Sequence, residues 1–587
     1  MCLGPARVGE LGEMGPEPGG YNPQRAFPLM SLPVDRTSTR IAAPPETPAV
    51  APAERLVDAL LAAALATVSI LYLWPFRDVL LLGRDEGIVL QGAARILQGQ
   101  LPYRDFFSFY TPGSYFWNAW LIKVFGDSIL VPRTVVLLYG AMFSVLTFVL
   151  ARRMASRTGA VAASLLLLIC CLPVRFLVTH NWDSTAAALL ALYCALGFLR
   201  NPSLGRAAGI GFLTSLSVLF NQARGVGLLL GLLVGFLMLR SRLPKSWMTS
   251  RHLLVMGAAF GLPLLATASF FAAHGSLRVM LQGLLWAPRH YTVANRVPYG
   301  FITIPISEWV ELFDSGPLWE HALHLFIISP IFIVCALPIV LVLIALWCAW
   351  KRRPDLDPAQ VSAVILSGAV VFGSLVSVVA TRADSTHVTF ITPLFFFLMP
   401  WVVERWSAPF LGLRKAAPLL AVYVLFSFTA YGLTLLWLVR ENTVQQQTRR
   451  SLGRVVRKNE TIEFIEAHFP AGSTLLVHPY FPVYSFLTRT VSPLPYDFLY
   501  SGMHTREQFE EGVARLERLR PGAVLYEPGF ASKIPTTSPR MPAARMVEDP
   551  VEDYLVRNYR ACAVLDWDSR APFLVMVRKD LPCSDYR

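Results

Sequence analysis

The chain has 587 residues, of which 54% are hydrophobic and only 16% are charged, and its mean hydropathy is +0.48. Because soluble proteins carry about a quarter charged residues, this composition excludes an ordinary soluble protein and indicates an integral membrane protein. The net charge of +13 does not indicate a nucleic-acid partner, since the basic residues are concentrated in short loops between apolar segments.

Residues 1–52 precede the first apolar segment and are rich in proline and glycine. They lack the basic segment and short apolar core of a secretory signal peptide. We therefore expect a disordered cytoplasmic leader over residues 1–52, followed by a transmembrane domain over residues 53–440.

Apolar segments near the ~20 residues that a helix needs to cross a bilayer recur along this domain. Hydropathy predicts eleven spans, near residues 56–76, 129–150, 158–178, 184–199, 207–221, 225–239, 253–273, 322–349, 360–380, 387–403 and 416–439. The sequence thus predicts an all-α polytopic membrane domain.

Alternate short loops are rich in basic residues, and such loops face the cytoplasm. The rich loops contain Arg152, Arg153, Arg157, Arg200, Arg206, Arg240, Arg242, Lys245, Arg251, Lys351, Arg352, Arg353, Arg405, Arg414 and Lys415. The opposite turns contain chiefly Arg224 and Arg382. The N-terminus is then inside, and an odd number of spans places the C-terminus outside. The long loops 77–128 and 274–321 share that outer side, where we expect the active site.

Both outer loops carry amphipathic, aromatic patterns. Val89, Ala93 and Ile96 share one face of a predicted helix over residues 86–98, and residues 115–126 form a second such segment. These patterns suit helices at the membrane interface. In the loop 274–321, headgroup-level anchors are expected at Trp286, Tyr291, Tyr299 and Trp309.

Residues 441–587 change to alternating helical and strand-like patterns, which predict a small α/β domain outside the cytoplasm. Helices are expected over 461–469 and 505–519, and strands over 474–477, 523–526, 561–567 and 572–578, the last two flanking a turn at 568–571. Cys562 and Cys583 both lie in this region, and an outer location would permit a disulfide, although their spacing does not establish one.

Several features of the first outer loop resemble the GT-C superfamily of bacterial membrane glycosyltransferases. These are Asp85-Glu86 after the first span, the segment RILQGQLPYRDFF and the Pro112-Gly113 turn. The superfamily includes protein O-mannosyltransferases and the transferases that add aminoarabinose to lipid A. The resemblance implies transfer of a sugar from a polyprenyl-phosphate carrier to an acceptor at the outer membrane face.

The resemblance assigns Asp85 as the general base that takes the proton of the acceptor hydroxyl, and Glu86 as an acid that orients Asp85 or the acceptor. The structural alternative for Asp85 is a cap of the following helix, and the two roles are compatible. Asp105 is a second acid expected near the cavity, with Arg104 beside it; the alternative is a surface ion pair between them.

A departing phosphate needs cations. The segment TRADSTH offers Arg382 and His387, which the resemblance places near the carrier phosphate, and Arg224 is a further candidate. The alternative for Arg382 is an ion pair with Asp384 that closes a tight turn, and Arg224 equally fits a capping or snorkelling role. In HNWDS, residues 180–184, Asp183 or Ser184 is expected to cap the next helix.

One departure from the lipid A aminoarabinose transferases bears on the acceptor. Those enzymes place a lysine shortly before a Pro-Pro pair in the first loop, whereas this chain reads Phe109-Tyr110-Thr111-Pro112-Gly113. Their phosphate contact therefore does not transfer. No cofactor is assigned, and a divalent cation at Asp85 is left open.

These observations predict a bacterial inner-membrane glycosyltransferase with inverting chemistry, a polyprenyl-phosphate sugar as donor and an envelope glycan, lipid or protein as acceptor. Its partners are these substrates and the lipid bilayer, and its catalytic face and C-terminal domain are periplasmic. The alternatives are a transporter or flippase of lipid-linked glycans and a non-catalytic envelope scaffold. A transporter is disfavoured because the charges gather at one membrane face and no internal repeat is evident.

Overall fold

The computed structural model describes residues 52–80, 84–244, 247–302, 316–351, 356–406, 417–546, 548–566 and 572–586. The residues from Arg55 onward form one compact unit. The expected leader lies outside the described residues except for Pro52. Trp309, the turn at 568–571 and the loop residues Lys245, Arg352, Arg353, Arg414 and Lys415 also lie outside them.

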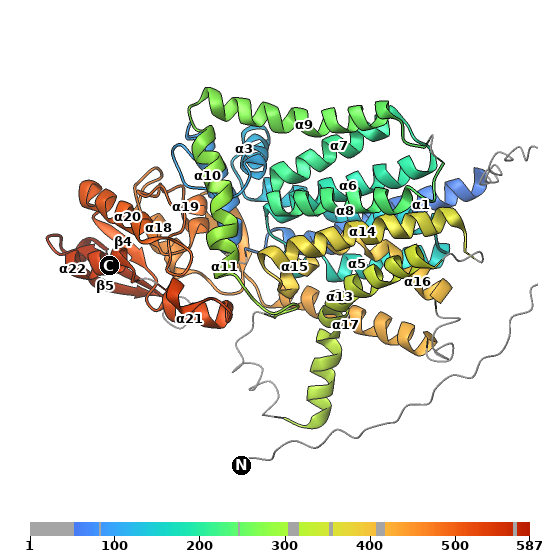
Figure 1. Ribbon diagram of the computed structural model, residues 1–587. Helices are drawn as coiled ribbons and strands as arrows, with labels where there is room; N and C mark the ends of the chain where they lie inside the picture. Colours follow the sequence, from blue (N-terminus) through green and yellow to red (C-terminus); the bar gives the residue numbers. More distant parts are fainter. Residues whose placement is uncertain are drawn as a thin grey trace, which may run out of the picture. The chain divides into compact units, whose positions relative to one another are not determined.

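Eight helices among the described residues are long and apolar enough to cross a membrane (Figure 1). They are α1 (Pro52–Arg77), α4 (Leu130–Ala151), α6 (His180–Arg200), α8 (Gln222–Leu239), α9 (Ser250–Ala273), α13 (Leu318–Trp350), α14 (Pro358–Thr381) and α17 (Ala417–Glu441). Two shorter apolar helices, α5 (Arg157–Cys170) and α7 (Leu204–Phe220), match two more expected segments. The predicted helical membrane architecture is confirmed, but the count of eleven spans is not.

The segment expected to span at 387–403 is not one continuous helix. It consists of α15 (Ser385–Thr389), two 3-10 turns, η3 (Thr392–Leu394) and η4 (Phe396–Leu398), and α16 (Met399–Trp406). Pro393 stands at the start of the first turn, where its ring prevents a regular helix from continuing. Phe395, Phe396 and Phe397 are fully buried. Irregular backbone is tolerated at membrane depth only where protein surrounds it, as it does here.

The loop 77–128, which the sequence predicts to be the first outer loop, contains the two predicted helices, α2 (Arg84–Leu97) and α3 (Gly113–Phe125). Residues 86–95 of α2 are buried, because α2 packs on α3 and on α19 (Pro482–Thr488) of the C-terminal region. Its polar residues are therefore paired inside the protein. For example, Arg95 donates from Nε to Asp497 Oδ1 at 2.8 Å and from Nη2 to the carbonyl oxygen of Leu494.

The second outer loop forms α10 (Leu277–Trp286), the π-helical turn η2 (Ala287–Tyr291) and α11 (Thr292–Ala294). Trp286 packs its ring against Phe107 and Phe109 of the first loop, with ring centroids 5.1 Å apart in each pair. The two outer loops are thus joined through aromatic side chains.

The C-terminal region is the predicted α/β structure. It contains a hairpin of β1 (Val444–Thr448) and β2 (Ser451–Val455) and a four-stranded sheet of β3 (Leu476–His478), β4 (Ala523–Tyr526), β5 (Tyr559–Leu565) and β6 (Phe573–Arg578) in the order β3-β4-β6-β5. Strands β3 and β4 are parallel, whereas β6 runs antiparallel to both of its neighbours. The remaining helices are α18 (Glu460–His468), α20 (Arg506–Leu519), α21 (Phe530–Thr537) and α22 (Pro550–Asn558), with short 3-10 turns η5 (Ala543–Arg545) and η6 (Cys583–Tyr586).

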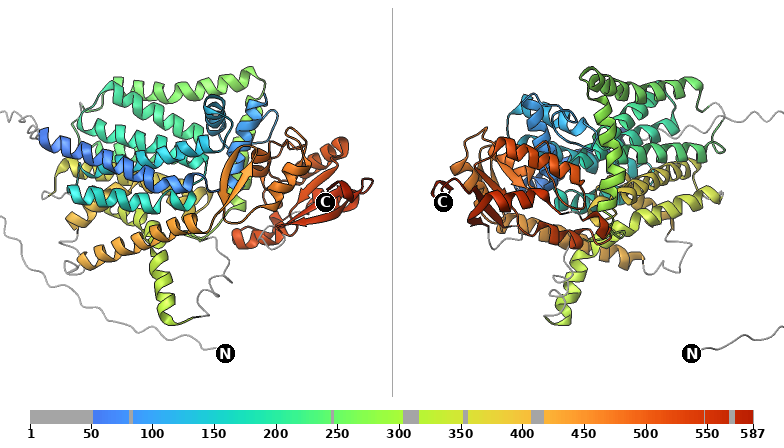
Figure 2. Two further views of the ribbon diagram at one scale, coloured as in Figure 1. Left: turned by 180° about the vertical axis from the view of Figure 1, so that it is seen from behind. Right: turned by 60° about the vertical axis from the view of Figure 1, so that its left-hand side comes forward.

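In all three views, these C-terminal elements, coloured orange to red, lie at one end of the helix bundle (Figure 2). An ion pair fixes this junction: Arg454 of β2 pairs with Asp78, just after α1, at 2.8 Å. The backbone amide of Arg454 also donates to the carbonyl oxygen of Asp78, and Leu80 donates back to Arg454.

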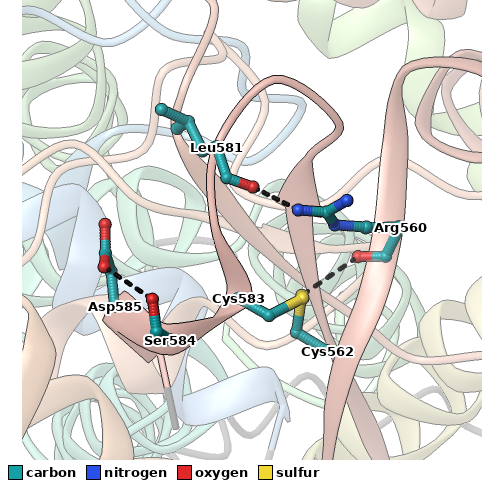
Figure 3. The surroundings of a disulfide bond; sticks show 6 residues. All are labelled: Arg560, Cys562, Leu581, Cys583, Ser584 and Asp585. Atoms are coloured by element: carbon teal, nitrogen blue, oxygen red, sulfur yellow. Dashed lines mark hydrogen bonds between the residues drawn. A yellow bond between two sulfur atoms is a disulfide. The ribbon is translucent and has the colours of Figure 1, made fainter.

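Cys562 and Cys583 form a disulfide bond, with their Cα atoms 5.5 Å apart (Figure 3). The bond joins β5 to the turn η6 near the end of the chain. Arg560 supports the same junction by donating from Nη2 to the carbonyl oxygen of Leu581. The pairing that the sequence left open is therefore present.

Candidate active site

A cavity of about 340 Å³ lies where α6 and α8 begin and α14 ends. Its polar lining includes Tyr110, His180, Asn181, Asn221, Gln222, Arg224, Tyr291 and His387, and its apolar lining includes Val226, Leu230, Leu284, Val376 and Ala380. Leu230 lies six residues along α8 from Arg224, which is about 9 Å of helix. Val226, Leu230 and Val376 are also exposed. The cavity therefore joins a polar head region to an accessible apolar wall.

Glycines allow the two helices of this wall to meet at backbone distance. A Cβ added to Gly373 of α14 would clash with the carbonyl oxygen of Gly227 on α8. A Cβ added to Gly227 would likewise clash, at 2.5 Å from the carbonyl oxygen of Gly373. Close approach of small residues is a common means of packing membrane helices. It fixes Arg224, one turn before Gly227, relative to the end of α14.

Arg224 is the cation of this cavity, and only 7% of its surface is exposed. Its Nε donates to Asn181 Oδ1 at 2.9 Å, and its Nη2 donates to the carbonyl oxygen of His387 at 3.1 Å. Asn221 caps α8 and donates from Nδ2 to the same Asn181 oxygen. Within the described structure, Nη1 of Arg224 is buried without a hydrogen-bond partner. A buried guanidinium with donors to spare is suited to hold an anion.

Two histidines lie beside Arg224. The His180 ring packs on Tyr110, with centroids 4.1 Å apart, and its Nδ1 has no partner among the described residues. Nδ1 of His387 lies 2.7 Å from Asp384 Oδ1. Burial raises the pKa of Asp384, but the charges and hydrogen bonds of His387 and Arg382 outweigh it and hold this pKa well below the ordinary range. Asp384 is therefore an anion that fixes the His387 ring at the cavity wall.

Arg382 does not line the cavity. Its Nε pairs with Asp384 Oδ2 at 2.5 Å, as in the structural alternative considered above. Its Nη1 and Nη2 donate to Asn295 Oδ1 and to the carbonyl oxygen of Thr537 in α21. Arg382 thus holds Asp384 and joins it to the C-terminal region.

Asp85 lies in the first turn of α2 and is exposed. Its Oδ1 accepts a hydrogen bond from the Tyr480 hydroxyl at 2.8 Å. Burial and, to a lesser extent, the charge of Asp85 raise the pKa of Tyr291 to about 12, against an opposing effect of Arg382. Burial likewise raises the pKa of Tyr110, with Asp85 among the contributing charges. Since Tyr110 and Tyr291 also line the cavity, Asp85 stands close to its polar end.

Glu86 is fully buried and does not reach the cavity. It forms two hydrogen bonds with Arg133 of α4, from Nε to Oε1 at 2.9 Å and from Nη2 to Oε2 at 2.6 Å. The backbone amide of Val178 donates to Oε1 as well. Both carboxylate oxygens are thus occupied. Glu86 therefore has no oxygen left to contact an acceptor.

Arg104 and Asp105 form a surface ion pair at 2.7 Å, which the sequence offered as the alternative to a role near the cavity. Arg104 remains 43% exposed in its side chain, and Asp105 also accepts from the backbone amide of Leu101. Neither residue lines the cavity. The sequence predicted that they lie near the cavity because they share a loop with Asp85. The turn after α2 instead places them at the surface.

Asp183 is not a helix cap, because α6 already begins at His180 with Thr179 as its N-cap residue. The Asp183 carboxylate accepts from the hydroxyls of Ser114 and Tyr139, which joins α6 to α3 and α4. Among the described residues, no group of three or more His, Cys, Asp or Glu side chains is arranged to hold a metal ion.

Comparisons with known proteins agree on the fold. No family model and no curated protein matches the sequence. The structure of ArnT from Cupriavidus metallidurans bound to undecaprenyl phosphate superposes with a TM-score of 0.50 and 13% identity, covering 90% of this chain and 98% of that one. The archaeal oligosaccharyltransferase AglB from Archaeoglobus fulgidus, in complex with an inhibitory peptide and a dolichol-phosphate, gives 0.50 and 11% over 91% and 75%.

The chain has the GT-C fold. The resemblance that the first outer loop suggested is therefore confirmed at the level of the fold, which is what similarity at this low identity establishes. The sequence named Tyr110 and Tyr291 without assigning them to the cavity, and it did not single out Tyr480, the partner of Asp85, or Arg133, the partner of Glu86. Tyr480 lies 395 residues after Asp85, and no sequence signal connects the two.

Proposed function

We propose that this chain is a membrane glycosyltransferase that uses a polyprenyl-phosphate sugar as its donor. The observation that carries the proposal is the buried Arg224 guanidinium, whose unpartnered Nη1 belongs to a cavity with an apolar wall. A phosphate on a long isoprenoid chain has this same division of anionic head and apolar tail. The fold neighbours support it, because ArnT binds undecaprenyl phosphate and AglB binds a dolichol-phosphate.

In the proposed step, an acceptor hydroxyl attacks the anomeric carbon and the bond from that carbon to the phosphate oxygen breaks. Asp85 accepts the hydroxyl proton, and the polyprenyl phosphate leaves with its charge stabilised by Arg224 and His387. A single displacement inverts the anomeric centre. Glu86 orients Asp85 through α2, and Arg382 orients His387 through Asp384.

The step takes place on the side of the membrane that holds residues 441–587, and we assign this side to the periplasm of a bacterial inner membrane. The basic residues support the assignment. The C-terminal ends of α4, α6, α8 and α13 lie opposite the cavity and carry several basic residues. These residues are Arg152, Arg153, Arg200, Arg240, Arg242 and Lys351. Basic loops face the cytoplasm. Residues 53–440 then form the catalytic membrane domain, and the leader is cytoplasmic.

The test is Asp85→Asn, which keeps the side-chain shape but removes the base. Cells lacking the protein should accumulate a polyprenyl-phosphate sugar and lose one residue from an envelope glycan, lipid or protein, both measured by mass spectrometry. We expect Asp85→Asn to leave both changes in place although the variant still binds polyprenyl phosphate. Asp105→Asn is the matched control, because Asp105 belongs to the same loop outside the cavity, and it should restore both. Restoration by Asp85→Asn would refute Asp85 as the base.

A further inference from the structure

A second cavity, of about 280 Å³, lies in the C-terminal region between α21, α22 and the loops that follow β3 and β4. Three aromatic side chains line it: Tyr500, Tyr526 and Phe530. The Tyr500 and Phe530 rings meet at an angle of 60° with centroids 5.2 Å apart, and Phe530 is 8% exposed. Aromatic faces of this kind pack against apolar ring faces and attract cations.

The same cavity is lined by five carboxylates, Glu527, Glu548, Asp549, Glu552 and Asp553, and by no lysine or arginine among the residues that the structure describes. Two of them are satisfied within the protein. Glu527 pairs with Lys533 at 2.9 Å, and Asp549 pairs with His478 and caps α22.

The other three, Glu548, Glu552 and Asp553, form no ion pair with the described residues, and Glu552 accepts a hydrogen bond from the hydroxyl of Tyr526. Placement of Glu552 and Asp553 in the first turn of α22 favours that helix. Stabilisation of α22 does not explain why aromatic rings from β4 and α21 line the same cavity.

This cavity is joined to the proposed active site by one residue. Tyr480 follows Pro479, which lines the cavity, and the Tyr480 ring lies 5.5 Å from Tyr500 and 6.5 Å from Phe530 between centroids. The Tyr480 hydroxyl donates to Asp85 at 2.8 Å. A ligand held against Tyr500 and Phe530 is therefore one tyrosine away from the carboxylate that takes the proton.

We infer that the second cavity binds the acceptor, and that it holds an amine-bearing sugar unit next to the unit that reacts. This inference rests on the proposed function, since it assigns the cavity to the acceptor of that reaction. The aromatic faces pack on the sugar ring, and the carboxylates without an ion pair accept hydrogen bonds from its hydroxyls and pair with its ammonium group. The carboxylates of this lining repel a phosphate, so we expect a phosphorylated unit to bind less well.

Calorimetric titration of the full chain in lipid nanodiscs, without donor, tests the inference. The probe is a disaccharide of glucosamine, compared with the N-acetylated disaccharide and with trilysine. We expect saturable binding of the glucosamine disaccharide, and weaker binding of both comparison ligands. Glu552→Gln should weaken binding about tenfold, the effect of losing one charge-assisted hydrogen bond.

Phe530→Leu, which keeps an apolar side chain but removes the ring, should also weaken binding several-fold. Glu510→Gln is the matched control, because Glu510 is an exposed carboxylate on α20 that pairs with Arg506, and its binding should equal that of the wild type. Thermal unfolding of each variant establishes that it is folded.

The inference is overturned if the folded wild type shows no saturable binding, if Glu552→Gln and Phe530→Leu bind as the wild type does, or if trilysine binds as tightly as the amino sugar. Because no donor is present, Asp85→Asn should bind the probe normally. Continued transfer by Asp85→Asn would refute the proposed function alone, whereas intact transfer without probe binding would refute only this acceptor site.

Discussion

Arg224→Met removes the guanidinium that the proposed function requires, and its effect on binding differs from its effect on stability. In the ligand-free protein, Arg224 is buried and bonded to Asn181 Oδ1 and a carbonyl oxygen, with Nη1 unpartnered. Desolvation of this cation is incompletely compensated, so an apolar side chain of similar length should leave the melting temperature unchanged or raise it.

Binding should change in the opposite direction. A hydrogen bond to a charged group contributes about 1.5–3 kcal/mol, and its loss weakens affinity by about 10-fold to 150-fold. We expect at least this loss for undecaprenyl phosphate in Arg224→Met, since the variant removes every donor of the guanidinium. Affinity is measured by titration in nanodiscs, and stability by thermal unfolding of the same preparations.

Arg242→Met is the matched control from the other end of α8. Arg242 Nη2 donates to the carbonyl oxygens of Cys348 and Ala349 at the end of α13, a structural role. This variant should lower the melting temperature and leave affinity intact. Unchanged affinity for undecaprenyl phosphate in a folded Arg224→Met would refute the phosphate site.

Two further predictions concern the residues that position the site. Glu86→Gln breaks a fully buried ion pair with Arg133. It should reduce the free energy of unfolding by about 3–5 kcal/mol, measured by denaturant titration. Adding Arg133→Met to this variant should recover part of the loss, and an additive loss in the double variant would contradict the pairing. Because the pKa of Asp384 is lowered in the folded protein, its contribution to stability is complete above about pH 4 and is lost as the pH falls further, so the acid side of the stability profile should flatten in Asp384→Asn. A profile identical to that of the wild type would show that Asp384 does not contribute in this way.

The sequence alone determined the membrane architecture and the elements of the C-terminal region. Apolar segments of span length, and strands separated by polar helices, are local patterns that a window of 10 to about 20 residues contains. The prediction of one continuous span over residues 387–403 was wrong, because the structure breaks this segment into short helices and turns. Its hydropathy is that of a membrane helix, but Pro393 interrupts it, and neighbouring helices bury the irregular backbone.

Only the tertiary structure decided which polar residues meet. Asp85, Glu86, Arg104 and Asp105 share one loop in the sequence, yet packing leaves Asp85 beside the cavity, buries Glu86 on Arg133 and turns the other two to the surface. A helix or turn that rotates by a few residues directs a side chain to a different environment, and that rotation depends on distant contacts. Tyr480 reaches Asp85 from another part of the chain. Convergence of this kind is a property of packing, which no local pattern records.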